Sequence, residues 1–138
     1  MHIPAYQAAL LQAKAHRKLR QEVSALLSPF NLNLLEWALL GMVSADKEVR
    51  ITSAASELGV EIPMITNLLN SLEEKKMIER SVDQQDKRKR TLTLTKLGIE
   101  TLACSQSHLK TELQHNFDDV STKDLEGYFN VLNAIIKT

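Results

Sequence analysis

The chain has 138 residues, enough for one folded domain and few for two. Its hydrophobic and charged fractions, 43% and 25%, are ordinary for a globular protein. No apolar run approaches the roughly 18 residues of a membrane span, so no membrane span is expected. The formal net charge is zero, the N-terminus does not resemble a signal peptide, and the single cysteine excludes an internal disulfide, so a cytoplasmic protein is expected.

The N-terminal part of the sequence predicts two helices separated by a break. Pro4 suits the first turn of a helix, and apolar residues then recur at helical spacing as far as Leu27. The segment Ser28–Phe30 ends this helix, because the residue before a proline disfavours the α conformation. Asn33 predicts the start of the next helix, since its side chain can cap that helix while Glu36 returns the bond in a capping box.

The central part of the sequence predicts a short strand followed by a helix-turn-helix. Val49–Ile51 is β-like and is expected to be a third strand of a small sheet. Thr52 is expected to cap a helix that ends at Leu58, and Gly59 fits the left-handed position that closes a helix. A second helix, the candidate recognition helix, is expected from about residue 61 to residue 76.

A β-hairpin and two helices complete the predicted order. The expected strands are residues 77–80 and 91–95, and threonines alternate with leucines in the second of them. Thr95 can cap a long helix that ends near Phe117, and Ser121 can cap the last helix. The predicted fold class is mainly α with a small β-hairpin wing, a winged helix-turn-helix with N- and C-terminal dimerisation helices.

The terminal helices carry more apolar surface than a core of this size needs. The chain is therefore expected to be a single domain, 1–138, in which a winged helix-turn-helix lobe at 31–98 lies between dimerisation helices at 1–30 and 100–138. The economical arrangement is a two-fold homodimer that interleaves these helices. The alternative is a monomer whose terminal helices fold back on the lobe.

Basic charge is concentrated around the predicted hairpin. Residues 75–90 hold seven Lys or Arg against three acidic residues, and residues 1–30 hold four against one. Residues 31–74 and 100–138 are net acidic. A charged run is usually a solvated loop, but this run follows a recognition-type helix, which favours binding to DNA.

The candidate recognition helix has an apolar and a polar face. Four apolar residues recur at the spacing of one helix face and are expected to point into the core. They are Ile65, Leu68, Leu69 and Leu72. The outward positions hold small polar and amide side chains, of which Asn can pair with adenine N6 and N7, and Thr or Met can pack on a thymine methyl. Together with two positions of the preceding helix, the predicted DNA-binding residues here are Thr52, Ser53, Pro63, Met64, Thr66, Asn67, Asn70 and Ser71.

The loop between the predicted strands carries four consecutive cations that are expected to bind DNA beside this helix. They are Lys87, Arg88, Lys89 and Arg90. Arg88 is expected to enter a minor groove, whose negative potential attracts arginine when the groove is narrow, and Asp86 is expected to orient its guanidinium. The other cations would neutralise phosphates, which predicts an affinity that falls steeply with salt.

Several motifs carry a resemblance to a known family. They are Leu58–Val60, Ile65–Leu69, Leu72–Arg80, Asp83 with Asp86–Arg88, and Leu94–Thr95 followed by Gly98. This combination resembles the MarR (multiple-antibiotic-resistance regulator) family of bacterial transcription regulators over nearly the whole chain. The resemblance implies a homodimer that binds a pseudo-palindrome in double-stranded DNA, usually as a repressor, and that a ligand or oxidation releases. Two departures are Lys76, where the family usually has glycine, and Asn67, where it often has arginine.

Two features could serve as sensors of thiol or metal chemistry. Cys104 has no Lys, Arg or His beside it in the sequence and is expected to be a small buried hydrophobe. His108, Glu112 and His115 share one helix face at a spacing that could hold zinc, but without a dense ligand cluster a solvated face is expected. No metal site and no cofactor is predicted.

A small-molecule effector would bind between the dimer helices and the DNA-binding lobe. By their positions in the family, His16, Phe30 and Trp37 are the candidate pocket residues. Core packing is the expected role of Phe30 and Trp37. The sequence does not identify the effector.

Catalytic motifs are missing from the sequence, so an enzyme is not expected. It has no Gly-rich phosphate loop, no His-Glu-x-x-His and no Gly-x-Ser-x-Gly. The predicted function is that of a sequence-specific transcriptional regulator. The alternative is an antirepressor-like winged helix that docks on another protein. Such a module would expose aromatic or aliphatic anchors, and Met64 is the only one expected on the outward face.

Overall fold

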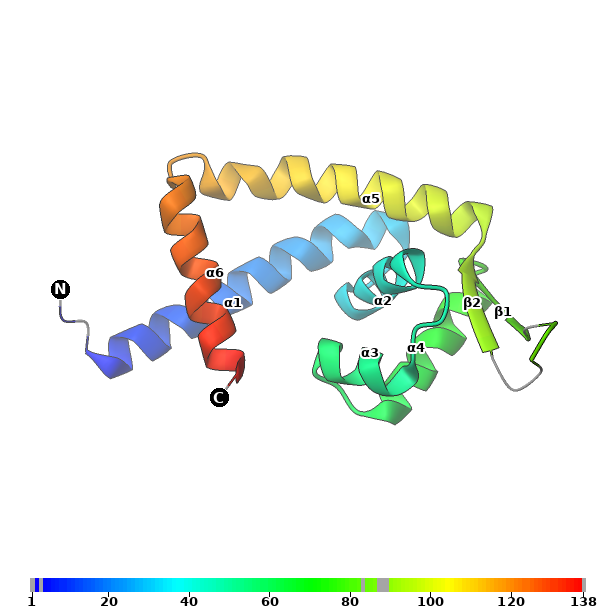
Figure 1. Cartoon of the computed structure of the whole chain (residues 1–138). Coiled ribbons are helices and arrows are strands. Elements are labelled where there is room, and N and C mark those ends of the chain that lie inside the picture. Colours follow the sequence, from blue (N-terminus) through cyan, green and yellow to red (C-terminus); the bar gives the residue numbers. More distant parts are fainter. Residues whose placement is uncertain (1, 3, 83, 87–89, 138) are drawn as a thin grey trace.

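The fold is a helical arm joined to a lobe that contains a β-hairpin (Figure 1). The computed structural model describes residues 2, 4–82, 84–86 and 90–137. In this part of the chain the helices and 3₁₀ turns are, in order, α1 (Ala5–Leu27), η1 (Ser28–Phe30), α2 (Leu34–Ala45), α3 (Ile51–Leu58), α4 (Ile62–Glu74), α5 (Lys96–Gln114), η2 (His115–Phe117) and α6 (Thr122–Lys137). Strands β1 (Ile78–Val82) and β2 (Arg90–Leu94) lie between α4 and α5 and form an antiparallel pair. The predicted fold class, mainly α with a hairpin wing, is confirmed.

The spatial arrangement separates the two ends of the chain from the lobe. Helices α2, α3 and α4 and the hairpin lie together at one end of the molecule (Figure 1). The long helices α1 and α5 pack against each other, and α6 turns back from the far end of α5. Helix α5 also packs on α2, so it belongs to the lobe as well as to the arm.

Local capping residues set the helix starts that the sequence predicted. The Asn33 side chain accepts the Glu36 N–H at 2.8 Å, and the Glu36 carboxylate accepts the Asn33 N–H at 3.1 Å, which completes the capping box of α2. The Thr95 hydroxyl accepts a backbone N–H of α5 at 3.0 Å, and Ser121 caps α6 in the same way at 3.1 Å. Gly59 closes α3 at φ 68°, in the left-handed region.

The predicted third strand at Val49–Ile51 is wrong. The sheet in the described chain has two strands, and Leu92 of β2 donates a backbone hydrogen bond to the Lys47 carbonyl, ahead of this segment, at 3.0 Å. Asp46 prevents further pairing, because its side chain accepts the N–H of Glu48 and its carbonyl accepts the N–H of Val49. The chain therefore curls into a turn and enters α3 directly.

The predicted cap of α3 is also wrong. This helix begins at Ile51, with Arg50 at the N-cap position and no side-chain cap. Thr52 lies within the first turn, and the Ala54 N–H donates to the Arg50 carbonyl at 2.9 Å. Thr52 and Ser53 are exposed on this turn, so their side chains remain available at the surface.

The hydrophobic core lies in the lobe, where α2, α4, the hairpin and α5 meet. The four residues predicted to form the inner face of α4 are buried, each with 6% or less of its surface exposed. They pack in one cluster with buried residues of neighbouring elements. Those include Leu27, Leu39, Leu40, Val43, Ile78, Leu92, Leu102 and Leu109. Since α1 and α5 contribute to this cluster, the arm and the lobe share one core.

A tight joint connects the hairpin to α5. The Met77 carbonyl accepts the Thr95 N–H at 3.0 Å, and the Thr95 hydroxyl donates to the Lys76 carbonyl at 2.6 Å. Gly98 packs directly on this turn, since a Cβ at that position would lie 2.0 Å from the Met77 oxygen. Lys76 has φ 60°, so this lysine adopts the left-handed conformation that glycine prefers. The joint sets the direction in which the hairpin leaves the core.

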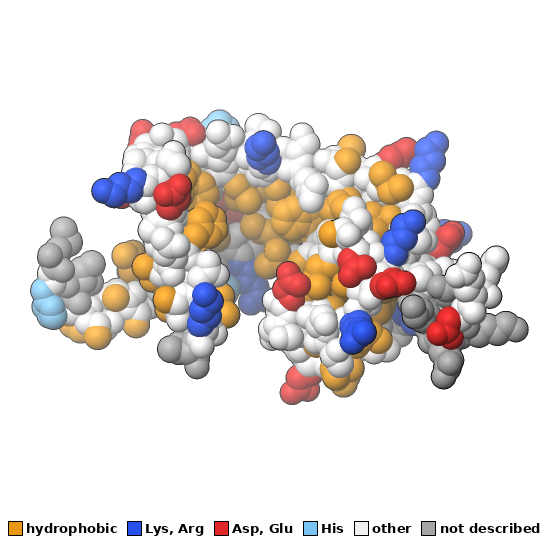
Figure 2. All heavy atoms as spheres, viewed as in Figure 1, with side chains coloured by type: hydrophobic (Ala, Val, Ile, Leu, Met, Phe, Trp, Pro, Cys, Tyr) orange, Lys and Arg blue, Asp and Glu red, His pale blue; other side chains and the backbone are white. Residues whose placement is uncertain are grey.

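The helices of the arm leave large apolar side chains uncovered. Helix α6 buries none of its residues. Figure 2 shows hydrophobic side chains along α6 and in the space between α5, α6 and the lobe. The exposed large hydrophobic residues of α1 and α6 are Tyr6, Leu10, Leu11, Tyr128, Phe129, Val131, Ile135 and Ile136. This surface lies on the two segments that were predicted to be dimerisation helices.

Among the described residues, no single helix has both the length and the apolar character needed to cross a membrane. Two consecutive helical segments, Ala5–Phe30 and Leu34–Ala45, are together long and apolar enough, but the angle between them is 67°.

Candidate nucleic-acid interface

The helix-turn-helix presents a polar surface opposite its apolar core. Helix α3 packs on α4, and Gly59 makes the turn between them. With the inner face of α4 buried, its other positions are exposed apart from Ser71. Seven of the eight predicted DNA-binding residues of this unit are exposed, and they are Thr52, Ser53, Pro63, Met64, Thr66, Asn67 and Asn70. The structure thus gathers small polar and amide side chains on one surface of α3 and α4.

Ser71 does not point outward as predicted. It is half-buried, and its hydroxyl donates to the Glu36 carboxylate at 2.7 Å. Helical spacing alone placed Ser71 at the edge of the polar face. Its partner lies 35 residues earlier in the sequence, so no local pattern indicated this contact.

Glu36 connects α2 to the end of α4. The Lys75 ammonium lies 2.8 Å from the Glu36 carboxylate and also donates to the Asn31 carbonyl at 2.7 Å. Burial raises the pKa of Glu36, but hydrogen bonds from Lys75, Ser71 and the Asn33 backbone, together with the charge of Lys75, outweigh that effect and hold the pKa below its ordinary value. The sequence indicated only the capping role of Glu36. This network fixes the orientation of α4 relative to the core.

Arg80 of β1 reaches back to the recognition helix. One terminal nitrogen of its guanidinium donates to the Asn70 side-chain oxygen at 2.7 Å, and Nε lies 3.3 Å from the Glu73 carboxylate. Arg80 is not among the predicted site residues. The only available signal was that an arginine follows a buried strand residue, Ile78, by two positions, and that signal does not predict its partner.

The predicted wing cations fall largely outside the described residues. Lys87, Arg88 and Lys89 are not described, and of Arg90 only the backbone is described, paired with Val82 in the hairpin. Asp86 is half-buried. The hydroxyls of Ser81 and Thr91 lie 2.6 Å apart and link the strands next to the loop. Strand β1 of the hairpin packs on α4, and the contacts of the loop cations stay predictions.

Aliphatic side chains on the helix-turn-helix surface are more numerous than predicted. Met64 is 44% exposed, as expected for an outward position. Ile51 and Ile62 are also exposed, at 40% and 49%, so the expectation that Met64 is the only exposed anchor is wrong. Both isoleucines stand at the first residue of a helix, α3 and α4, where the turn before them does not cover the side chain.

Cys104 is exposed, so the prediction that it is buried is wrong. The inward positions of α5 are taken by Leu102, Ser105 and Leu109, and Cys104 lies off that face. Ser105 occupies the buried place instead, accepting a hydrogen bond from the Trp37 indole at 3.0 Å and donating to the Leu102 carbonyl at 3.0 Å.

The histidines of the arm do not assemble a metal site in the part of the chain that the structure describes. That part holds no group of three or more His, Cys, Asp or Glu residues close enough to share an ion. The His108 ring lies against Phe30, with 6.0 Å between ring centroids. The Nδ1 atom of His115 is 3.4 Å from the Asp118 carboxylate.

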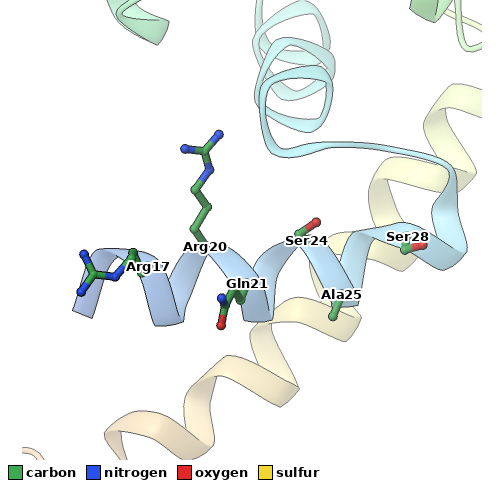
Figure 3. Close-up of a pocket in the computed structure, with 6 residues that line it drawn as sticks. All are labelled: Arg17, Arg20, Gln21, Ser24, Ala25 and Ser28. Carbon is green, nitrogen blue, oxygen red and sulfur yellow. The ribbon is translucent and has the colours of Figure 1, made fainter. Parts of the chain in front are cut away.

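An open hollow of about 620 Å³ lies along α1. Figure 3 shows its lining, with Arg20 projecting away from the helix axis. The lining residues are Arg17, Arg20, Gln21, Ser24, Ala25 and Ser28. The predicted pocket residues are placed elsewhere: His16 is exposed on α1, Phe30 packs on the core, and Trp37 is bonded to Ser105. The structure therefore does not bring these three side chains into this hollow.

Comparison with known proteins agrees with this geometry. The MarR family model matches residues 32–89, which run from the start of α2 into the hairpin loop. A curated relative, an uncharacterised HTH-type transcriptional regulator named YdcH from Bacillus subtilis, is 30% identical over 96 residues, 67% of this chain. The matched part spans 65% of that relative's length.

Solved structures share the fold over almost the entire chain. The structure of CouR from Rhodococcus jostii bound to p-coumaroyl-CoA has a TM-score of 0.82 at 18% identity and covers 94% of this chain and 91% of CouR. The MepR–DNA complex of S. aureus has a TM-score of 0.79 at 24% identity and covers 94% of each chain. Residues 32–89 therefore carry the winged helix-turn-helix segment of the MarR family, and the chain shares the fold of these solved regulators.

Proposed function

We propose that this protein is a homodimeric regulator of transcription that binds a pseudo-palindromic operator as a repressor and leaves it when a small molecule or stress signal arrives. It acts by binding and not as an enzyme. The observation that carries the proposal is the outward face of α4, where Thr66, Asn67 and Asn70 are exposed opposite a buried apolar face. An α-helix fits the DNA major groove, and these side chain types read base edges there.

The hairpin supports this proposal by its position. It leaves the core next to α4 through the joint at Met77 and Thr95, and its loop carries the sequence Lys87–Arg90. When α4 lies in a major groove, that loop would reach the neighbouring minor groove, where arginine is attracted to the negative potential. The MepR relative was solved in complex with DNA.

The uncovered apolar surface of the arm supports a two-fold dimer. Helix α6 is 16 residues long and buries none of them, and Phe129, Ile135 and Ile136 are 59%, 59% and 80% exposed. Contiguous exposed apolar surface of this kind marks an association site. A dimer would place two α4 helices on the two half-sites of an inverted repeat.

The hollow along α1 supports an acidic effector. Arg17 and Arg20 line it, and the structure gives neither of them an ion-pair partner among the described residues. Two guanidinium groups in an open hollow favour carboxylate or phosphate groups. The CouR relative was crystallised with a coenzyme A thioester, which carries phosphates.

Selection of binding sequences tests the proposal. Purified protein would select from fragmented genomic DNA, and each enriched fragment would be compared with a scrambled duplex. An inverted repeat is expected to be enriched. Asn67→Ala should reduce the selectivity, whereas Glu112→Ala, an exposed change on α5, should leave it unchanged.

A protein-docking module is the alternative function, and one observation favours it. Ile51, Ile62 and Met64 expose aliphatic surface at the start of α3 and α4. Aliphatic anchors of this kind are typical of protein contacts. No enrichment of any sequence, with weak and equal binding to all duplexes, would favour this alternative over the DNA-binding proposal.

A further inference from the structure

We propose that Arg80 is a positioning residue that turns the Asn70 carboxamide so that its NH₂ group, and not its oxygen, faces the DNA. Asn70 would then read a base that offers hydrogen-bond acceptors, with guanine preferred and cytosine rejected. This inference rests on the proposed DNA-binding function and adds the base class that one residue selects.

The geometry fixes the guanidinium of Arg80 at two points. Nη2 donates to Asn70 Oδ1 at 2.7 Å, and Nε lies 3.3 Å from Glu73 Oε2. Asn70 and Glu73 are three residues apart in α4, so they lie on the same side of the helix. With two contacts on neighbouring side chains, the guanidinium cannot rotate freely, and the Asn70 oxygen is held toward the hairpin.

The chemistry of arginine decides which end of the carboxamide points outward. A guanidinium has N–H donors and no acceptor, so it can face only the oxygen of the Asn70 side chain. The NH₂ group of Asn70 then points away from Arg80, and Asn70 is exposed on the outward face of α4. The carboxamide therefore presents two N–H donors to anything that covers this face.

The four bases respond differently to a pair of donors. Guanine offers two neighbouring acceptors in the major groove, N7 and O6, whereas cytosine offers only the N4 donor. Adenine and thymine offer one acceptor each, N7 and O4. The bidentate contact of Asn with adenine needs the amide oxygen to face the base as well, and Arg80 holds that oxygen toward the hairpin. The expected order at this position is guanine first, adenine and thymine next, and cytosine last.

Selection with three variants tests the positioning role. Asn70→Ala identifies the operator position that Asn70 reads, because the base preference is lost there. Arg80→Met removes the donor to Asn70, so the amide can turn and adenine should gain on guanine at that position, by about tenfold in relative affinity. Glu73→Gln is the matched control, since it keeps the hydrogen bond between Arg80 and Asn70 and should keep the guanine preference. If Arg80→Met also removed a phosphate contact, the affinity for all sequences would fall equally, so the ratio of the affinities for guanine and adenine would not change.

A second variant keeps the test valid if Arg80→Met does not fold. Asn70→Asp retains an oxygen for Arg80 but turns an acceptor toward the DNA, so the preference should change from guanine to cytosine. If the wild type selects an operator but Asn70→Asp and Arg80→Met leave every base preference unchanged, the inference is refuted while the proposed function stands. If the wild type selects no sequence, both are refuted.

Discussion

Replacing Gly98 by alanine tests the joint between the hairpin and α5. The added Cβ would lie 2.0 Å from the Met77 carbonyl oxygen, whereas ordinary contacts of this kind are no closer than about 3.4 Å, so the joint must open by more than 1 Å. The atom that the new Cβ would meet belongs to the backbone, and the hydrogen bond from the Thr95 N–H to the Met77 carbonyl holds it in place. Overpacking costs roughly 1–3 kcal/mol and a lost hydrogen bond about 1 kcal/mol more, so we expect Gly98→Ala to lower the free energy of unfolding by about 3 kcal/mol.

Urea denaturation followed by circular dichroism, at one fixed protein concentration, measures this change. The matched control is Gly41→Ala in α2, where an added Cβ meets no atom within 4 Å. There the higher helix propensity of alanine should stabilise the protein by up to about 1 kcal/mol. The two glycine substitutions are thus expected to have opposite signs. A Gly98→Ala variant as stable as the wild type would refute the steric argument.

Lys76→Gly should stabilise the protein by about 0.5–1 kcal/mol in the same urea assay, because relief of the left-handed φ exceeds the added chain entropy of glycine; a loss of stability would contradict this. Glu36→Gln should lower the free energy of unfolding by about 2 kcal/mol at neutral pH. Because the folded-state pKa of Glu36 is lowered, the carboxylate stabilises the protein above about pH 4.5, and this stabilisation is lost as the pH falls through the folded-state pKa. The difference in the free energy of unfolding between wild type and Glu36→Gln should therefore become smaller in acid. A difference that does not change with pH would argue against the network. Phe129→Asp in α6 should convert dimers to monomers in sedimentation experiments, and an unchanged molecular mass would exclude α6 from the interface.

The elements that could be predicted are those specified by residues close together in the sequence. The capping box of Asn33 and Glu36, the left-handed Gly59 and the cap at Thr95 each act within four residues, and the structure contains all of them. The buried stripe of α4 follows from its spacing in the same way.

The features that sequence analysis missed depend on contacts between distant segments. Ser71 turns inward because its hydroxyl donates a hydrogen bond to Glu36 of another helix. Arg80 can contact Asn70 only after the hairpin has folded against α4. The burial of Cys104 was predicted from its residue type, but Ser105 takes the inward position because it also bonds to Trp37. Such choices between neighbouring residues need the partner helix in place.

Lys76 stands where the MarR resemblance predicts glycine, and both its backbone conformation and its contact with Thr95 matter for the turn. The MarR resemblance places glycine at this position, and Lys76 adopts the left-handed φ of 60° that explains the preference. The Lys76 carbonyl accepts the Thr95 hydroxyl at 2.6 Å, which helps to hold the strained residue. The turn into the hairpin is therefore retained with lysine, at a cost in stability.

Sequence-specific DNA binding is best tested by measuring the affinity of the protein for a selected duplex and for a scrambled duplex at two salt concentrations. We expect the selected duplex to bind at least about a thousandfold more tightly, and the affinity for both duplexes to fall steeply with salt because binding releases counterions from the DNA. Equal affinity for the two duplexes, or binding that does not change with salt, would contradict this expectation.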